Sequence, residues 1–439
     1  MSQTILIRSP LIVSSSQTIR KDLLIKNGII VSIKDHISYS ADLIIDGKHL
    51  VLMPGVLDPH VHFREPGLEW KETIESGSHA AAKGGITSFF DMPNNNPSTT
   101  TINLIKQKKE LAAKTSLINF NFFIGANSSN IDETNSCGNI PGAKIFMGSS
   151  TGDLLLANDQ ALEKFFANCK HAIVIHAEHE KTIQANKKIF SDSKDILTHE
   201  KIRSANAALI ALKQAISLAN KYNNRLHLLH ITSKEEISYL RTMSPNKLIS
   251  AEATPQHLLL HSPLVYEKFQ TFAQVNPPIR TKEDQESLWQ GLKDGVIHVV
   301  ATDHAPHTKD EKEKSFPNTP SGMPGIETSL PLMLNLVNQK KCSINQVVEW
   351  MCENPCKIFK VKNKGFIKEG YDADIVLVDM KKTKTIKNED LFTKVKWSIF
   401  NGMEITGWPL ITIVNGNIVY NDGKLYTEIK GKEILIESV

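Results

Sequence analysis

The chain has 439 residues, which exceeds most single hydrophobic cores but suits one α/β barrel of about 250 residues with a smaller domain. Its 51 lysine and arginine residues nearly balance 47 aspartate and glutamate residues, which argues against nucleic acid or an anionic membrane surface as a partner. No window approaches about 18 uninterrupted apolar residues, which disfavours a membrane span. The five cysteines include no Cys-x-x-Cys pair, which disfavours a disulfide framework and a structural zinc knot. A cytoplasmic location is therefore expected.

Short β-strands are expected at both ends of the chain. Asn-Gly and Asp-Gly dipeptides separate the apolar stretches there and supply the positive φ angles that tight hairpin turns need. The stretches are 4–13, 22–33 and 41–55 at one end, and 372–379 and 411–425 at the other. We therefore predict a small β-sandwich built from residues 1–53 and 365–439.

The middle of the chain, residues 54–364, alternates apolar runs with helix-like stretches. Helical periodicity is clearest in residues 70–84, 102–114 and 206–222. The apolar runs that we interpret as eight buried strands are 55–63, 85–93, 118–126, 142–150, 171–178, 225–232, 248–255 and 296–306. Such alternation predicts an α/β fold, a (β/α)8 TIM-type barrel, whose active site lies at the carboxyl ends of its strands.

Reactive side chains recur at the ends of these runs. They are His60 and His62 in the first run, Asn94 after the second, Lys144 in the fourth, and His176, His230 and Asp303 at the ends of the fifth, sixth and eighth. Strand ends are often exposed and polar, but recurrence in six of the eight runs favours one common site.

The histidines and the aspartate have the character of metal ligands. His60 and His62 are two residues apart, so both imidazoles point to one face of a strand. With His176, His230 and Asp303 they form a set that suits zinc. One four-coordinate catalytic zinc that also binds a water has room for fewer than five protein ligands. We therefore predict two zinc ions.

Lys144 lies where the middle of a barrel strand should be apolar. A buried ammonium beside two zinc ions would be strongly disfavoured. If the amine instead reacts with carbon dioxide, the resulting carbamate offers one oxygen to each metal. The alternative is a lysine whose stem carries its ammonium out to solvent.

Two motifs carry a resemblance to a known family. The stretches DPHVHFREPG (58–67) and ATDHAPHTKDEK (301–312) resemble the paired signatures of the dihydroorotases, within the metal-dependent amidohydrolase superfamily. The likeness covers essentially the whole chain, because DMPNNNP, KIFMGSS, IHAEH, VNPPIR and GMPGIETSLPLML also match in order. The later stretch GYDADIVLVD is shared by many amidohydrolases and supports only the superfamily.

The resemblance implies a role for each site residue. One zinc would be held by His60, His62 and Asp303, the other by His176 and His230, with carboxylated Lys144 between them. The substrate carboxylate and ring would contact Arg64, Asn94 and Asn276, with His307 completing the clamp and backbone groups around Ser321 and Gly322 at the pyrimidine edge. Some dihydroorotases have a bridging aspartate after the fourth strand, where this chain has Gly148 and Ser149, which favours Lys144 and leaves Asp153 as the alternative.

The implied activity is the reversible cyclisation of N-carbamoyl-L-aspartate to (S)-dihydroorotate and water in de novo pyrimidine biosynthesis. A hydroxide activated by two zinc ions would attack, with Asp303 as general acid and base. The expected partners are a small-molecule substrate and a second copy of the chain in a homo-oligomer, in the simplest case a dimer.

Two alternatives remain at this point. An allantoinase or a dihydropyrimidinase would share the metals, but its neutral ring offers no carboxylate to Arg64. A non-catalytic homologue that associates with aspartate transcarbamoylase should have lost ligands, whereas every expected ligand position here is filled.

Other histidines and one loop also lead to expectations. His227 lies three residues before His230 and is expected to face away from the site, toward the helices. His179 and His304 lie near the mouth and are expected to orient ligands. Residues 307–325 are long for a barrel loop, which predicts a lid or a substrate-facing rim, with a solvated charged segment as the alternative.

Overall fold

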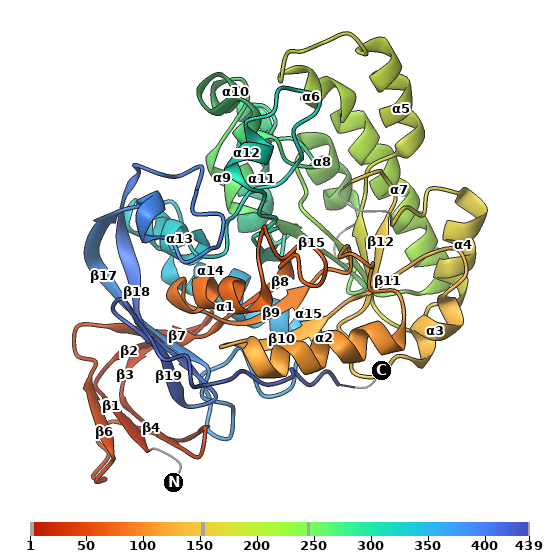
Figure 1. Ribbon diagram of the computed structural model, residues 1–439. Helices are drawn as coiled ribbons and strands as arrows, with labels where there is room; N and C mark the ends of the chain where they lie inside the picture. The colour runs from red at the N-terminus through yellow and green to blue at the C-terminus, as the bar shows by residue number, and fades with distance from the viewer. Residues whose placement is uncertain (1–3, 151–153, 244–245, 438–439) are drawn as a thin grey trace.

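The computed structural model describes residues 4–150, 154–243 and 246–437. In Figure 1 these residues form a barrel of parallel strands and, below it to the left, a sandwich in which N-terminal strands and C-terminal strands lie side by side. The predicted fold class is confirmed. Within the described ranges, no helix combines the length and the apolar character needed to cross a membrane.

The barrel strands lie within the eight apolar runs. In chain order they are β8 (Val56–Val61), β9 (Ile86–Asp91), β10 (Asn119–Phe122) continued by β11 (Ile124–Gly125), β12 (Ala143–Phe146), β13 (Ile173–His176), β14 (Leu226–Leu228), β15 (Ile249–Ala253) and β16 (Val299–Val300). Neighbouring strands pair in parallel. The barrel closes where Val61 pairs with His304, just after β16.

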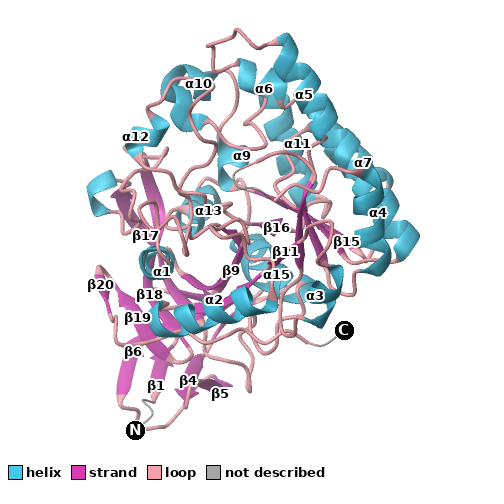
Figure 2. Ribbon diagram, turned by 45° about the vertical axis from the view of Figure 1, so that its right-hand side comes forward, coloured by secondary structure: helices cyan, strands magenta, loops and turns pink. Residues whose placement is uncertain are grey.

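Helices cover the outside of the barrel, as Figure 2 shows for α4, α5 and α7. Alanines at Ala211, Ala215 and Ala219 give α7 a small buried face, which lets the helix lie close to the strands. The three helices predicted most clearly are α1 (Ile74–Lys83), α2 (Ile102–Thr115) and α7 (Ala205–Tyr222). The others are α3 (Ile131–Ser136), α4 (Asp159–Asn168), α5 (Glu180–Ile189), α6 (Thr198–Ile202), α8 (Lys234–Thr242), α9 (Pro255–Leu259), α10 (Leu264–Phe269), α11 (Lys282–Lys293), α12 (Lys309–Lys312), α13 (Ser329–Asn338), α14 (Ile344–Val348) and α15 (Asn354–Ile358).

Two sheets form the sandwich. The four-stranded sheet has the order β5-β4-β1-β6 and the seven-stranded sheet the order β20-β19-β18-β17-β7-β2-β3. Their strands are β1 (Ile5–Arg8), β2 (Leu11–Val13), β3 (Thr18–Arg20), β4 (Asp22–Lys26), β5 (Ile29–Lys34), β6 (Leu43–Asp46), β7 (Val51–Pro54), β17 (Ile375–Thr385), β18 (Glu404–Val414), β19 (Asn417–Asn421) and β20 (Lys424–Leu425). N-terminal β7 pairs with C-terminal β17, so one sheet joins the two ends of the chain.

The segment after β20 returns to the barrel. Glu433 pairs with Phe120 of β10, and the fully buried Ile434 packs in one cluster with Phe90 and Phe123. Residues from the C-terminal end therefore contribute to the barrel as well as to the sandwich.

We expect Ile434→Ala to lower the free energy of unfolding by about 2–5 kcal/mol, because it removes a buried side chain and leaves a cavity. The neighbouring Leu435 is 56% exposed, so Leu435→Ala is a matched control with little expected effect. Urea unfolding of both variants measures the difference, and equal losses would contradict the packing role of Ile434.

Candidate active site

A cavity at the carboxyl ends of the barrel strands gathers every predicted site residue except His307. The lining residues that were predicted are His60, His62, Arg64, Asn94, Lys144, His176, His230, Asn276, Asp303, Ser321 and Gly322. Phe146, Ser150 and Ala305 also line it. The side chains come from many separate strands, which is the arrangement expected of a barrel active site.

His60, His230 and Asp303 are close enough to one another to belong to one metal centre, and His62 lies beside them. The Oδ1 atom of Asp303 is 3.2 Å from Nε2 of His60 and 3.1 Å from Nε2 of His62. Ligand atoms of His60, His230 and Asp303 lie within 4.8 Å of one another. Burial alone would raise the pKa of Asp303, but the adjacent His60 and His62 hold it below its usual value, so the carboxylate is ionised at neutral pH.

His176 adjoins this group through its contact with His230. The Nδ1 atom of His176 and the Nε2 atom of His230 face each other at 2.9 Å. Burial lowers the pKa of His62 to about 4 and also lowers those of His176 and His230. Neutral imidazoles keep the lone pair that a metal ligand needs.

The backbone is strained at three of the site residues. Arg64, His230 and Asp303 have φ angles of 62°, 34° and 48°, in the left-handed region that favours glycine. Such conformations cost about 1–3 kcal/mol each and concentrate at functional sites. At these strand ends the turn directs the side chains into the barrel mouth.

Hydrogen-bond acceptors behind the histidines fix their orientation. Glu252 Oε1 lies 2.5 Å from Nδ1 of His60, and Asn94 Oδ1 lies 2.6 Å from Nδ1 of His62. Glu178 Oε2 lies 2.8 Å from Nε2 of His176. Each acceptor holds the ring hydrogen on the outer nitrogen and leaves the other nitrogen for the cavity.

Sequence reasoning missed Glu178 and Glu252. Both are fully buried acids within predicted strands, and such acids are almost always paired, so their position in an apolar run was the available signal. The prediction for His227 is wrong: its Nε2 lies 3.1 Å from Glu252, on the same side as His60. Simple alternation fails because β14 ends at Leu228 and the backbone leaves the strand conformation at His230, where φ is 34°.

Lys144 is almost completely buried, at 1% exposure, so the alternative in which its ammonium reaches solvent is wrong. Its Nζ atom lies 4.4 Å from the centre of the Phe146 ring. Among the described residues, no carboxylate lies within ion-pair distance of this amine. Burial lowers the pKa of Lys144 to about 7, so much of the amine is uncharged near neutral pH. Asp153, the alternative bridge, lies outside the described residues.

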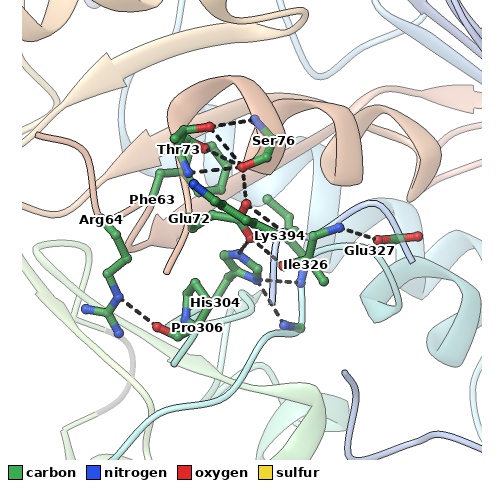
Figure 3. A network of polar contacts seen from close by, with 12 residues as sticks. Phe63, Arg64, Glu72, Thr73, Ser76, His304, Pro306, Ile326, Glu327 and Lys394 are labelled. Carbon is green, nitrogen blue, oxygen red and sulfur yellow. Dashed lines mark hydrogen bonds and ion pairs between the residues drawn. The ribbon is translucent and has the colours of Figure 1, made fainter. Parts of the chain in front are cut away.

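Arg64 is buried at the edge of the cavity. Its Nε atom donates to the Pro306 carbonyl at 3.1 Å, as Figure 3 shows, and its Nη2 atom lies 3.3 Å from Nε2 of His307. Burial lowers the pKa of Arg64 to about 10, which still leaves it protonated at neutral pH. No carboxylate in the described part of the chain lies within ion-pair distance of the guanidinium, so its charge has no direct anionic partner there.

His307 lies behind Arg64 instead of lining the cavity. Its Nε2 atom is 3.1 Å from the Ser321 carbonyl oxygen, and its Nδ1 atom is 3.0 Å from Nζ of Lys71. These contacts tie the Arg64 side chain to the loop that carries Ser321. The structure therefore places His307 next to the guanidinium, where it supports Arg64.

The histidine next to Asp303 anchors the chain beside the site. The Nδ1 atom of His304 accepts hydrogen bonds from the backbone N–H groups of Gly325 and Ile326 at 3.1 and 3.3 Å. Its Nε2 atom lies 3.6 Å from Oε2 of Glu72, and Figure 3 shows the contacts of His304 with Ile326 and Glu72. His179, by contrast, precedes α5 and contacts Thr182 at 2.8 Å.

The long loop of residues 307–325 forms one wall of the cavity. The buried Lys312 donates to the carbonyl oxygens of Gln274 and Pro320 at 3.0 and 2.8 Å. Gly322 has a φ of 141°, and a Cβ atom there would lie 2.5 Å from the Ala305 carbonyl oxygen, so only glycine fits. Ser321 and Gly322 bring the loop to the cavity lining, and a substrate-facing rim stays a prediction.

Asn276 adds a polar group to the cavity lining. Its Oδ1 atom is buried and finds no hydrogen-bond partner in the described part of the chain. A buried acceptor without a partner costs free energy, and a bound donor relieves that cost. The cavity therefore presents an acceptor on Asn276 and a cation on Arg64.

Comparison with known proteins agrees with this geometry. Residues 51–419 match the amidohydrolase family. The chain belongs to the amidohydrolase family. This amidohydrolase is 36% identical to the dihydroorotase of Methanosphaera stadtmanae, over 92% of this chain and 94% of that protein. It is 34% identical to the dihydroorotase of Pyrococcus horikoshii, over 89% and 86% of the two chains. The resemblance to the dihydroorotases is thereby confirmed.

Solved structures with a similar fold include a hydantoinase and a dihydropyrimidinase. The L-hydantoinase (dihydropyrimidinase) of Arthrobacter aurescens superposes with a TM-score of 0.94 at 29% identity, covering 99% of this amidohydrolase and 100% of that chain. The dihydropyrimidinase of Brevibacillus agri gives 0.91 at 27% identity, with 98% of each chain covered. These matches support the barrel and sandwich architecture.

Proposed function

We propose that this amidohydrolase is a dihydroorotase that interconverts N-carbamoyl-L-aspartate and (S)-dihydroorotate in pyrimidine biosynthesis. The observation that carries the proposal is the buried Arg64 guanidinium at the cavity, which has no carboxylate partner among the described residues. Both substrate and product carry a carboxylate that the planar guanidinium fork can bind in a bidentate manner.

The main competing substrates are neutral cyclic amides, such as the rings after which the similar hydantoinase and dihydropyrimidinase are named. An unsubstituted hydantoin or dihydropyrimidine ring has no carboxylate to place against Arg64. A buried guanidinium without a counter-charge is energetically costly, whereas a bound carboxylate offsets that cost. Arg64 therefore favours a carboxylated ring over a neutral one.

The residues of the cavity fit two zinc ions. We assign His60, His62 and Asp303 to one and His176 and His230 to the other, because neutral imidazoles and an ionised carboxylate are zinc ligands. Lys144 fits as a bridge once its nitrogen has bonded to the carbon of one carbon dioxide and released a proton. When bound, the two zinc ions supply an activated water and polarise the ring carbonyl.

The side chains divide the remaining tasks. Asp303 is ionised and can take a proton from the attacking water and pass it to the leaving ring nitrogen. In the biosynthetic direction it takes the proton of the ureido nitrogen. Arg64, Asn94 and Asn276 hold the carboxylate and the ring, and backbone groups at Ser321 and Gly322 face the pyrimidine edge.

Metal analysis together with a dihydroorotate hydrolysis assay tests this proposal. We expect two zinc ions per chain, and we expect dialysis against a chelator to abolish hydrolysis and to lower the melting temperature. A ligand at about 100 times its Kd stabilises the folded state by about 2.7 kcal/mol, so the melting temperature reports binding independently of turnover. Added zinc should restore both properties. Full activity in the chelated protein would contradict the proposal.

A further inference from the structure

Glu252 of β15 contacts histidines that belong to both halves of the proposed metal centre. Its Oε1 atom lies 2.5 Å from Nδ1 of His60 and accepts the backbone N–H of His230 at 3.2 Å. Its Oε2 atom lies 3.1 Å from Nε2 of His227. The side chain is fully buried, so both oxygens are engaged within the barrel.

His227 in turn has a fixed orientation. Its Nδ1 atom lies 2.8 Å from Oγ of Ser250, and its ring packs against Phe359 with 5.2 Å between ring centres. Since a carboxylate only accepts hydrogen bonds, His227 presents Nε2–H to Glu252. Ser250 orients His227, which therefore holds the Oε2 atom of Glu252 while His60 contacts the Oε1 atom.

The other acceptors behind the ligands each hold one ring. Asn94 contacts His62, and Glu178 contacts His176. Glu252 differs because it fixes the ring of His60 and the backbone of His230 together. The left-handed φ of 34° at His230 makes this backbone contact important, because the contact stabilises a conformation that a β-strand does not supply.

We propose that Glu252, held by His227, is a positioning residue that sets the spacing between the two halves of the metal centre. The inference rests on the proposed function, which assigns His60 to one zinc and His230 to the other. Loss of Glu252 would release the His60 ring and the His230 turn at once. Both zinc ions should then bind more weakly. Loss of Asn94 should lower the affinity only for the zinc ion held by His62.

Zinc competition against a chromophoric chelator tests the inference on the full-length protein. We expect Glu252→Ala to lower zinc affinity about 10- to 100-fold at both sites, the range for residues that orient metal ligands. Glu252→Gln should have a smaller effect, because its amide oxygen can still accept from His60. Asn94→Ala should lower zinc affinity at the site of His62 and leave the site of His176 and His230 at wild-type affinity.

Glu353 provides a matched control. It is also buried, and it accepts hydrogen bonds from the backbone N–H and the hydroxyl of Ser15, in the sandwich. We expect Glu353→Ala to keep wild-type zinc affinity. Melting temperatures of the zinc-free proteins separate a general loss of stability from the specific loss of zinc binding.

Three results would overturn the inference. The first is wild-type zinc affinity at either site in Glu252→Ala. If the wild-type chain binds two zinc ions and hydrolyses dihydroorotate, this result leaves the proposed function intact and overturns only the role of Glu252. A zinc-free Glu252→Ala protein that melts well below zinc-free Glu353→Ala would assign Glu252 a general structural role instead. A wild-type chain that binds no zinc would overturn the proposed function and this inference with it.

Discussion

Replacing Arg64 by alanine is expected to lower kcat/KM for dihydroorotate about 10²- to 10⁴-fold, mainly through a higher KM. The guanidinium is expected to donate two hydrogen bonds to the substrate carboxylate, each worth about 1.5–3 kcal/mol because both partners are charged. Burial strengthens the expectation, since water cannot easily replace the guanidinium at 2% exposure. Steady-state hydrolysis of dihydroorotate by both proteins measures the effect.

Two controls separate recognition of the carboxylate from damage to the fold. Arg64→Lys keeps the charge but loses the planar fork, so it should recover only part of the affinity. Hydrolysis of dihydrouracil, which lacks the carboxylate, should not fall in Arg64→Ala beyond any loss of folded protein. An unchanged KM for dihydroorotate in Arg64→Ala would remove the main support for the proposed substrate.

The sequence allowed the barrel and most of the cavity to be predicted, for a physical reason. Buried parallel strands appear as apolar runs, and the barrel brings their carboxyl ends together. A polar residue at the end of a run, such as His176 or Asp303, therefore has a predictable place even though its partners lie far away in the chain. Arg64 could be placed because it follows His62 at the same strand end.

The contacts behind the cavity could not be predicted in the same way. His60 and Glu252 are separated by 192 residues, and no local pattern states which buried acid meets which histidine. His227 was misplaced because strand alternation was extended past Leu228, where β14 has already ended. The return of Glu433 and Ile434 to the barrel likewise depends on packing between distant segments.

We expect Asp303→Asn to lower kcat for dihydroorotate hydrolysis about 10²- to 10⁴-fold, the usual contribution of a general acid or base. Asparagine has nearly the same shape as aspartate and keeps an oxygen that can face His60 and His62, but it cannot accept the proton of the attacking water. The KM should change much less than kcat. Zinc content measured on the same preparation shows how much of the loss reflects weaker metal binding.

Asp22 offers a matched control, because it is also buried but lies in the sandwich, 2.5 Å from the guanidinium of Arg8. Asp22→Asn should affect stability and leave kcat near the wild-type value. Loss of a side chain that acts only in the transition state lowers kcat. Loss of a side chain that binds the substrate and the transition state equally raises KM. Asp303→Asn and Arg64→Ala should therefore differ in kind. A zinc-loaded Asp303→Asn enzyme with near wild-type kcat would place the proton transfer on another group.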